Sequence, residues 1–183
     1  MKYLLNSIFL TILLFSFQKG NSQNSHLIDS EFSEKDMSIS VKQNSTYTNQ
    51  TSKKISKIFI YDWNHSYSSM STPLSKKLYS EYDSSILKSS SNQRGKTLIS
   101  QITIDNNPVE WERVVNNEDL IEIRLDKELD INQKIKILFE YTLYIPKFIE
   151  NYGYTNDIIN VKNCFFRFVP KFNHKPILIS NLS

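Results

Sequence analysis

The sequence has few cysteines, glycines and histidines, and these shortages exclude several kinds of site. It contains one cysteine, Cys164, and three glycines. A single cysteine cannot close an internal disulfide, so a domain built from this chain must depend on its apolar core. Phosphate loops, dinucleotide-binding turns and nucleophile elbows all need glycines for close backbone approach. We therefore expect neither a nucleotide-binding loop nor a serine-hydrolase elbow.

The single cysteine and the three histidines form no recognisable catalytic pattern. Cys164 lies in an apolar, strand-like run without a setting that would lower its pKa, which predicts a packed and inert thiol. His26, His65 and His174 lie far apart, and H-E-x-x-H is absent. Zinc hydrolysis needs two or three converging ligands and a base. We expect no catalytic, cofactor-binding or metal-binding residue in this chain.

The charged residues favour no acidic or basic binding face. The formal net charge is +3, from 22 basic and 19 acidic residues. Removal of Lys2 and Lys19 with a signal peptide would leave the chain nearly neutral, so a broad nucleic-acid surface is not expected.

Paired carboxylates suggest a glycosidase only if they face each other across a substrate. Glu110 and Glu112 share a predicted strand, whereas Glu81 and Asp83 follow each other on a predicted helix. Such spacings are common on solvated surfaces, so we interpret both pairs as surface charge. Asp62 lies near the end of the apolar run at 55–63, and a carboxylate bonded to a nearby turn is favoured there over a catalytic one.

The N-terminus has the pattern of a cleavable export signal. Lys2 precedes an apolar run over residues 4–17, which is shorter than the roughly 20 residues that span a bilayer. Cleavage is predicted after Ser22, so that Gln23 begins the mature chain. The alternative is an uncleaved anchor. We expect a periplasmic or extracellular protein with a signal at 1–22, a flexible segment at 23–34 and one domain at 35–183.

Short apolar runs separated by turn residues predict about seven strands. These runs cover residues 37–41, 55–63, 97–104, 109–114, 120–125, 133–145 and 158–169. The run at 55–63 is apolar on both faces and should be central, and 109–114 should pair with 97–104. The pattern predicts a mainly β fold, an antiparallel β-sandwich of about seven strands with one inserted α-helix.

The inserted helix is predicted from its start signal and its apolar spacing. Thr72 can cap it, and Pro73 suits its first turn. Its apolar stripe, at four-residue spacing, consists of Leu74, Leu78, Tyr82 and Ile86.

Aromatic residues are abundant and allow a second kind of function. Several of them could form a stacking face for sugars, or could simply pack in the core. These are Trp63, Tyr67, Trp111, Tyr141 and Tyr144. A stacking face would make the chain an exported binding or adhesion module, which is the alternative function.

A series of segments stands in an order and spacing that match the pattern of a known family. The first is Y-D-W-N-H-S-Y at 61–67, followed by S-T-P-L-S-K-K-L at 71–78. Later segments in the same order are Gly95–Thr97, Val109–Arg113, Tyr141–Phe148, Asn151–Tyr154 and Phe166–Pro170. Together these segments resemble the N-terminal β domain of exported bacterial aminopeptidases of the gluzincin, aminopeptidase-N type. The resemblance extends from about Phe32 to Ser183.

The resemblance implies a β-sandwich that braces a zinc-binding catalytic domain and forms part of the wall of its peptide cleft. In that family the zinc ligands and the general base belong to the catalytic domain, so no catalytic or metal residue is carried over to this chain. Its expected partner is therefore a metallopeptidase catalytic domain, and peptides are the substrate class of that domain. Two alternatives stay open: a truncated or fragmentary gene, with 35–183 shortened at its C-terminal end, or a stand-alone remnant.

Overall fold

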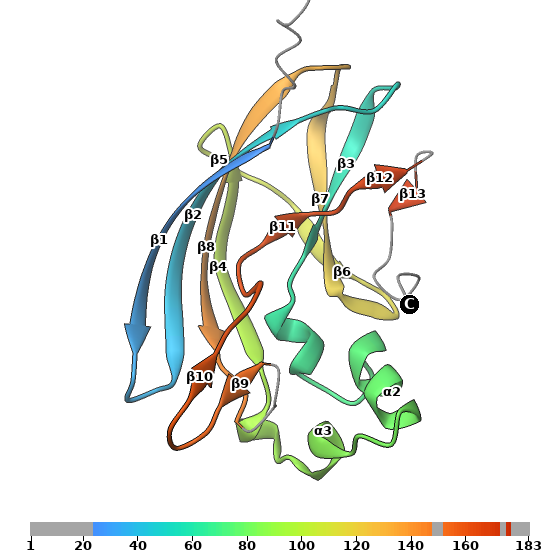
Figure 1. Cartoon of the computed structure of the whole chain (residues 1–183). Helices are drawn as coiled ribbons and strands as arrows, with labels where there is room; N and C mark the ends of the chain where they lie inside the picture. The colour runs from blue at the N-terminus through green and yellow to red at the C-terminus, as the bar shows by residue number, and fades with distance from the viewer. Residues whose placement is uncertain (1–23, 148–151, 173–174, 177–183) are drawn as a thin grey trace, which may run out of the picture.

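Two antiparallel sheets packed face to face form the body of the molecule (Figure 1). The computed structural model describes residues 24–147, 152–172 and 175–176. The predicted mainly β, antiparallel sandwich is confirmed. The predicted signal segment, with its cleavage site between Ser22 and Gln23, lies outside the described residues.

The larger sheet has five strands in the order β1-β2-β8-β4-β5. Their bounds are Ser25–Ser33 (β1), Ser38–Thr48 (β2), Lys134–Tyr144 (β8), Lys96–Ile104 (β4) and Asn107–Pro108 (β5). The smaller sheet has four strands in the order β11-β3-β7-β6. Their bounds are Arg167–Phe168 (β11), Ile55–Tyr61 (β3), Asn117–Leu129 (β7) and Trp111–Val114 (β6).

Short elements fill the rest of the described chain. Two small ladders pair β9 (Gly153–Tyr154) with β10 (Ile159–Asn160) and β12 (Lys171–Phe172) with β13 (Lys175–Pro176). Between β3 and β4 lie the helical pieces η1 (Asn64–Tyr67), α2 (Pro73–Ser80), α3 (Ser85–Lys88) and η2 (Ser91–Gln93). These helical pieces lie beyond one end of the sheets (Figure 1).

The core lies between the sheets because every second residue of the facing strands is apolar. In β8, alternate residues point inward and the polar residues between them point outward. The inward residues of β8, β3 and β7 are Ile137, Phe139, Tyr141, Leu143, Ile58, Ile60, Ile121 and Ile123, each at most 2% exposed. Burying each such side chain contributes about 2 kcal/mol.

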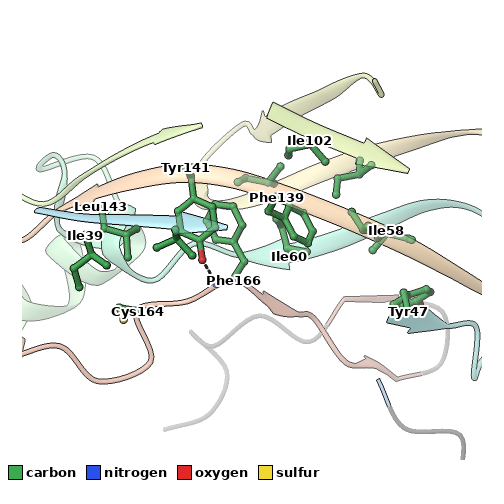
Figure 2. Packing of buried hydrophobic residues seen from close by; sticks show 14 of the residues in the cluster. Ile39, Tyr47, Ile58, Ile60, Ile102, Phe139, Tyr141, Leu143, Cys164 and Phe166 are labelled. Carbon is green, nitrogen blue, oxygen red and sulfur yellow. Dashed lines mark hydrogen bonds between the residues drawn. The ribbon is translucent and has the colours of Figure 1, made fainter. Parts of the chain in front are cut away.

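A polar contact inside this core fixes the path of the chain before β11 (Figure 2). The Tyr141 hydroxyl donates to Gln43 Oε1 at 2.8 Å and accepts the Phe166 amide at 3.2 Å. Gln43 in turn donates to the Phe166 carbonyl at 2.8 Å. The rings of Tyr141 and Phe166 stack with centroids 3.9 Å apart. This contact satisfies the backbone of an irregular segment that crosses the interior.

The segment 23–34 was expected to be flexible, but its described residues, 24–34, are mostly a strand. β1 pairs with β2 along all nine of its residues, Ser25–Ser33. Most side chains of β1 are exposed, so its sequence shows little alternation of apolar and polar residues. The strand is held mainly by its backbone hydrogen bonds to β2. β2 also extends to Thr48, seven residues beyond the predicted run at 37–41.

The helix predicted as one piece is two. α2 ends at Ser80, and Tyr82 follows with φ +65° and a 99% exposed side chain. The Asp83 carboxylate accepts the Ser85 amide at 2.8 Å and starts α3. Tyr82 therefore does not belong to the buried stripe, although Ile86 does.

Two predicted strands also differ from the structure. In the 109–114 run only the Val109 amide bonds to the 97–104 strand, at 3.3 Å from the Ile102 carbonyl; beyond it the chain crosses, and β6 joins β7 in the other sheet. The run at 158–169 contains only the two-residue strands β10 and β11. Phe166 and Cys164 of this run are buried within irregular backbone, whereas Ile158 and Ile159 are exposed.

Replacing Tyr141 with phenylalanine should lower the free energy of unfolding by about 1–3 kcal/mol. The change keeps the ring but leaves Gln43 Oε1 and the Phe166 amide without their partner. Tyr144→Phe, at a side chain 36% exposed, is the matched control and should cost under about 0.5 kcal/mol. Urea unfolding of the three proteins measures both values, and equal stabilities would contradict this role of the hydroxyl.

Candidate functional site

The turn after β3 brings together several fully buried polar side chains, those of Asp62, Asn64 and Ser66. It begins at Asp62, which is fully buried, and continues through the helical turn η1. The Asp62 amide donates to the Asp119 carbonyl of β7 at 2.8 Å, which continues the ladder between β3 and β7 past the end of β3. The strand thus delivers a carboxylate to the end of the core, where water is excluded.

Three donors from different elements converge on the Asp62 carboxylate. The Arg113 guanidinium of β6 binds Oδ2 at 2.8 Å. The Thr97 hydroxyl of β4 donates to Oδ1 at 2.8 Å, and the His65 amide of η1 reaches the same oxygen at 3.2 Å. We call Asp62, Thr97, Arg113 and the His65 amide the Asp62 cluster. It connects the two sheets and the turn at one end of the sandwich.

The electrostatics of the cluster combine burial with pairing. Burial raises the pKa of Asp62, and the charge and hydrogen bond of Arg113 oppose that rise. Arg113 also donates to the Glu118 carbonyl at 2.7 Å, so its position is fixed from two sides. Burial also raises the pKa of Asp119, whose carboxylate accepts the Ser66 hydroxyl at 3.4 Å.

The next buried polar residue, Asn64, uses both ends of its amide. Its nitrogen donates to Thr97 and to the Tyr144 carbonyl, each at 3.2 Å, and its oxygen accepts the Tyr152 hydroxyl at 2.9 Å. Gly95 lies against this residue so closely that a β-carbon there would be 2.6 Å from the Asn64 carbonyl. The glycine is therefore required by close packing.

The S-T-P-L segment attaches helix α2 to the same turn. The Thr72 hydroxyl accepts the Ser75 amide at 3.3 Å as an N-cap and donates to the Ser66 carbonyl at 2.6 Å. Pro73 occupies the first helical turn, where no amide is needed. The threonine thus caps the helix and joins it to the buried turn.

His65 is the most perturbed histidine described. Burial and the nearby positive charge of Arg113 lower its pKa from 6.5 to about 4. Its Nδ1 atom is buried without a hydrogen-bond partner among the described residues. The imidazole is therefore neutral at ordinary pH and could accept a proton only at a cost in stability.

The other candidate carboxylates lie on the surface and have local partners. Glu112 forms an ion pair with Arg124, and Lys77 lies 4.0 Å from Glu81. Glu110 is exposed. Glu110 and Glu112 line one open hollow together with Trp111 and Arg124, and there Arg124 neutralises Glu112, as expected for surface charge.

Cys164 is buried and unpaired, and burial raises the pKa of its thiol, as expected for a packed cysteine. His26 stacks on Phe168, with centroids 5.3 Å apart, and His174 lies outside the described residues. Within residues 24–147, 152–172 and 175–176, no three histidine, cysteine or acidic side chains come together in a way that could hold a metal.

The five aromatic residues that could have formed a stacking face for sugars do not lie on one surface. Tyr67 and Tyr141 are buried. Trp63 meets Tyr67 edge to face at 5.9 Å. Trp111 and Tyr144 are 37% and 36% exposed, but they belong to different sheets. A stacking platform of all five is therefore absent from the described surface.

Sequence reasoning identified Asp62 and its bond to a nearby turn, but it missed Thr97, Arg113 and Tyr152 as partners. A buried carboxylate requires a buried cation or several donors. Arg113 was therefore the residue to seek, since it lies between predicted strand residues. Sequence alone did not show which strand would bring it to Asp62.

No family model, curated protein or solved structure matches the chain. None of the described helices is long and apolar enough to cross a membrane.

Replacing Arg113 with alanine should destabilise the fold by about 3–5 kcal/mol, because it leaves the Asp62 charge buried without its cation. Lys54→Ala is the matched control: it removes an ion pair with Asp130 in which both side chains are 60% exposed, and should cost at most about 1 kcal/mol. Adding Asp62→Asn to Arg113→Ala should recover part of the loss. Equal effects of the two alanine variants in urea unfolding would contradict the role of the Asp62 cluster.

Acidification should weaken the fold through His65. Because its pKa is about 4 in the folded state and 6.5 when unfolded, its contribution is complete above pH 6.5 and is lost as the pH falls toward 4. Between pH 7 and 4.5 the wild type should lose about 1–2 kcal/mol more than His65→Gln, after allowance for partial solvent screening. Urea unfolding at both pH values measures this difference, and parallel losses would rule out the histidine as the cause.

Proposed function

We propose that the chain is a non-catalytic β-sandwich domain that braces the catalytic domain of an exported, aminopeptidase-like zinc metallopeptidase. In this proposal the catalytic domain is a separate unit that supplies the zinc ligands and the general base. The present domain supplies a rigid support beside the peptide cleft. Export would follow from the signal segment at 1–22, with Gln23 as the first mature residue.

The observation that carries the proposal is the use of the motif side chains inside the domain. In the Y-D-W-N-H-S-Y and S-T-P-L segments, Asp62, Asn64, Ser66 and Thr72 are all fully buried. Their polar atoms bond to one another and to neighbouring strands. Side chains occupied in this way cannot meet a substrate. A rigid, internally bonded turn is instead what a supporting domain requires.

The order of the resembling segments along the chain supports the aminopeptidase family in particular. Gly95–Thr97 and Val109–Arg113 contribute Thr97 and Arg113 to the Asp62 cluster. Tyr144 and Tyr152, from the later segments, bond to Asn64. Residues that carry the resemblance but are distant in sequence thus meet at one buried place. This convergence supports a shared structural role for the segments.

The test compares three proteins: this chain alone, the polypeptide encoded directly after it alone, and the two joined in one chain. We expect the following sequence to contain H-E-x-x-H, and zinc-dependent cleavage of aminoacyl-coumarin substrates only when that polypeptide is present. Joining the two should raise the thermal midpoint of the catalytic part. Arg113→Ala should reduce that gain, whereas Lys54→Ala should leave it unchanged.

Two results would overturn the proposal. One is zinc-dependent aminopeptidase activity of residues 23–183 alone. The other is a following sequence without a metallopeptidase signature, together with stoichiometric binding of glycans by the chain.

A further inference from the structure

Within the part of the chain that the structure describes, β1 leaves one edge of the larger sheet open. It is the terminal strand in the order β1-β2-β8-β4-β5 and lies at the left side of the sheet in Figure 1. All nine of its residues pair with β2. Among the described residues, no backbone hydrogen bond reaches β1 from its other side. The strand therefore presents a row of unpaired backbone groups to solvent.

The outward-facing backbone groups can be identified from the ladder. The Ile145 amide donates to the Met37 carbonyl, and the Asn49 amide donates to the Gln133 carbonyl. These bonds indicate that the odd-numbered residues of β2 bond to β8, so the even-numbered ones bond to β1. The register pairs even-numbered β2 residues with odd-numbered β1 residues. The amides and carbonyls that point outward therefore belong to His26, Ile28, Ser30 and Phe32.

Few of the usual devices that block an edge are present in β1. Its sequence, SHLIDSEFS, has no proline, glycine, lysine or arginine, and its register with β2 has no bulge. The two charged side chains, Asp29 and Glu31, are both acidic. The strand is thus long and regular enough to pair with a further strand, and its charge restricts which strand that can be.

The two faces beside this edge differ in chemistry. Asp29 and Glu31 lie on the outer face, where Lys42 already forms an ion pair with Glu140 at 3.1 Å. Asp29, Glu31, Glu140 and Lys42 line one open hollow on that face, so three carboxylates lie there with one lysine. On the other face lie Ile28, which packs against the core, and Phe32, which is 45% exposed.

We propose that β1 is a strand-addition site for an extended segment of a partner polypeptide in which lysine or arginine alternates with apolar residues. The outward backbone groups of β1 supply the ladder. The basic side chains lie opposite Asp29 and Glu31, and the apolar ones lie beside Ile28 and Phe32.

A second copy of this chain fits the edge poorly. The antiparallel register that pairs all nine residues of β1 with itself puts Asp29 opposite Asp29 of the second copy, and like charges in that position repel. The site also does not depend on the proposed bracing role, because β1 does not contribute to the Asp62 cluster.

The test uses two nine-residue peptides with blocked ends, one alternating lysine with valine and one alternating glutamate with valine. We expect the lysine peptide to bind and to protect the amides of residues 26, 28, 30 and 32 from hydrogen exchange. Ser30→Pro removes one outward amide without removing a bond to β2, and it should weaken binding about tenfold or more. Ser30→Ala keeps that amide and should bind as the wild type does.

The charge requirement is tested with the double variant Asp29→Lys, Glu31→Lys. It should bind the lysine peptide about tenfold more weakly and the glutamate peptide more tightly. Circular dichroism and thermal midpoints confirm that each variant is folded. Equal binding of the two peptides to the wild type, or unchanged binding to Ser30→Pro, would overturn the proposal. So would a concentration-dependent dimer that Ser30→Pro abolishes, because the edge would then accept a second copy.

Discussion

The ion pair between Asp62 and Arg113 is the interaction on which the rest of the site depends. A carboxylate with no solvent exposure must have its charge compensated and its oxygens bonded within the protein. Arg113, Thr97 and the His65 amide do so from three separate elements. Meeting this requirement fixes the end of the smaller sheet, one strand of the larger sheet and the turn between them. The position of α2 follows, since Thr72 bonds to the same turn.

The interior has a second set of hydrogen bonds that satisfies buried polar groups. Gln43 and Tyr141 satisfy the backbone of Phe166 where irregular chain crosses the core. Together, the two sets of hydrogen bonds specify how the sheets and the crossing segment align, which apolar burial alone would leave less defined. A domain fixed in this way is suited to hold a neighbour in place. Its open edge at β1 is a separate property that arises from strand order.

Much of the fold was predictable because its apolar pattern is strong. The inward residues of β8 and the apolar run that became β3 indicated strands, and Thr72 and Pro73 marked the start of α2 correctly. β1 was missed because its side chains are mostly exposed, so nothing in the sequence pattern showed that backbone bonds would hold it. Tyr82 fitted a helical stripe, but its backbone turns left-handed and its ring leaves the core. The partners of Asp62 were not predictable, since they depend on how strands distant in sequence align.

The most direct test of the central claim is amide hydrogen exchange across Asp62, His65 and Ser66. Their amides donate to Asp119, Asp62 and Trp63 in the buried turn. If this turn is an internal brace, these amides should exchange only through global unfolding, at the same free energy as the buried strand β7. Exchange several orders of magnitude faster than in β7, with β7 itself protected, would show a turn that opens independently and would contradict the account.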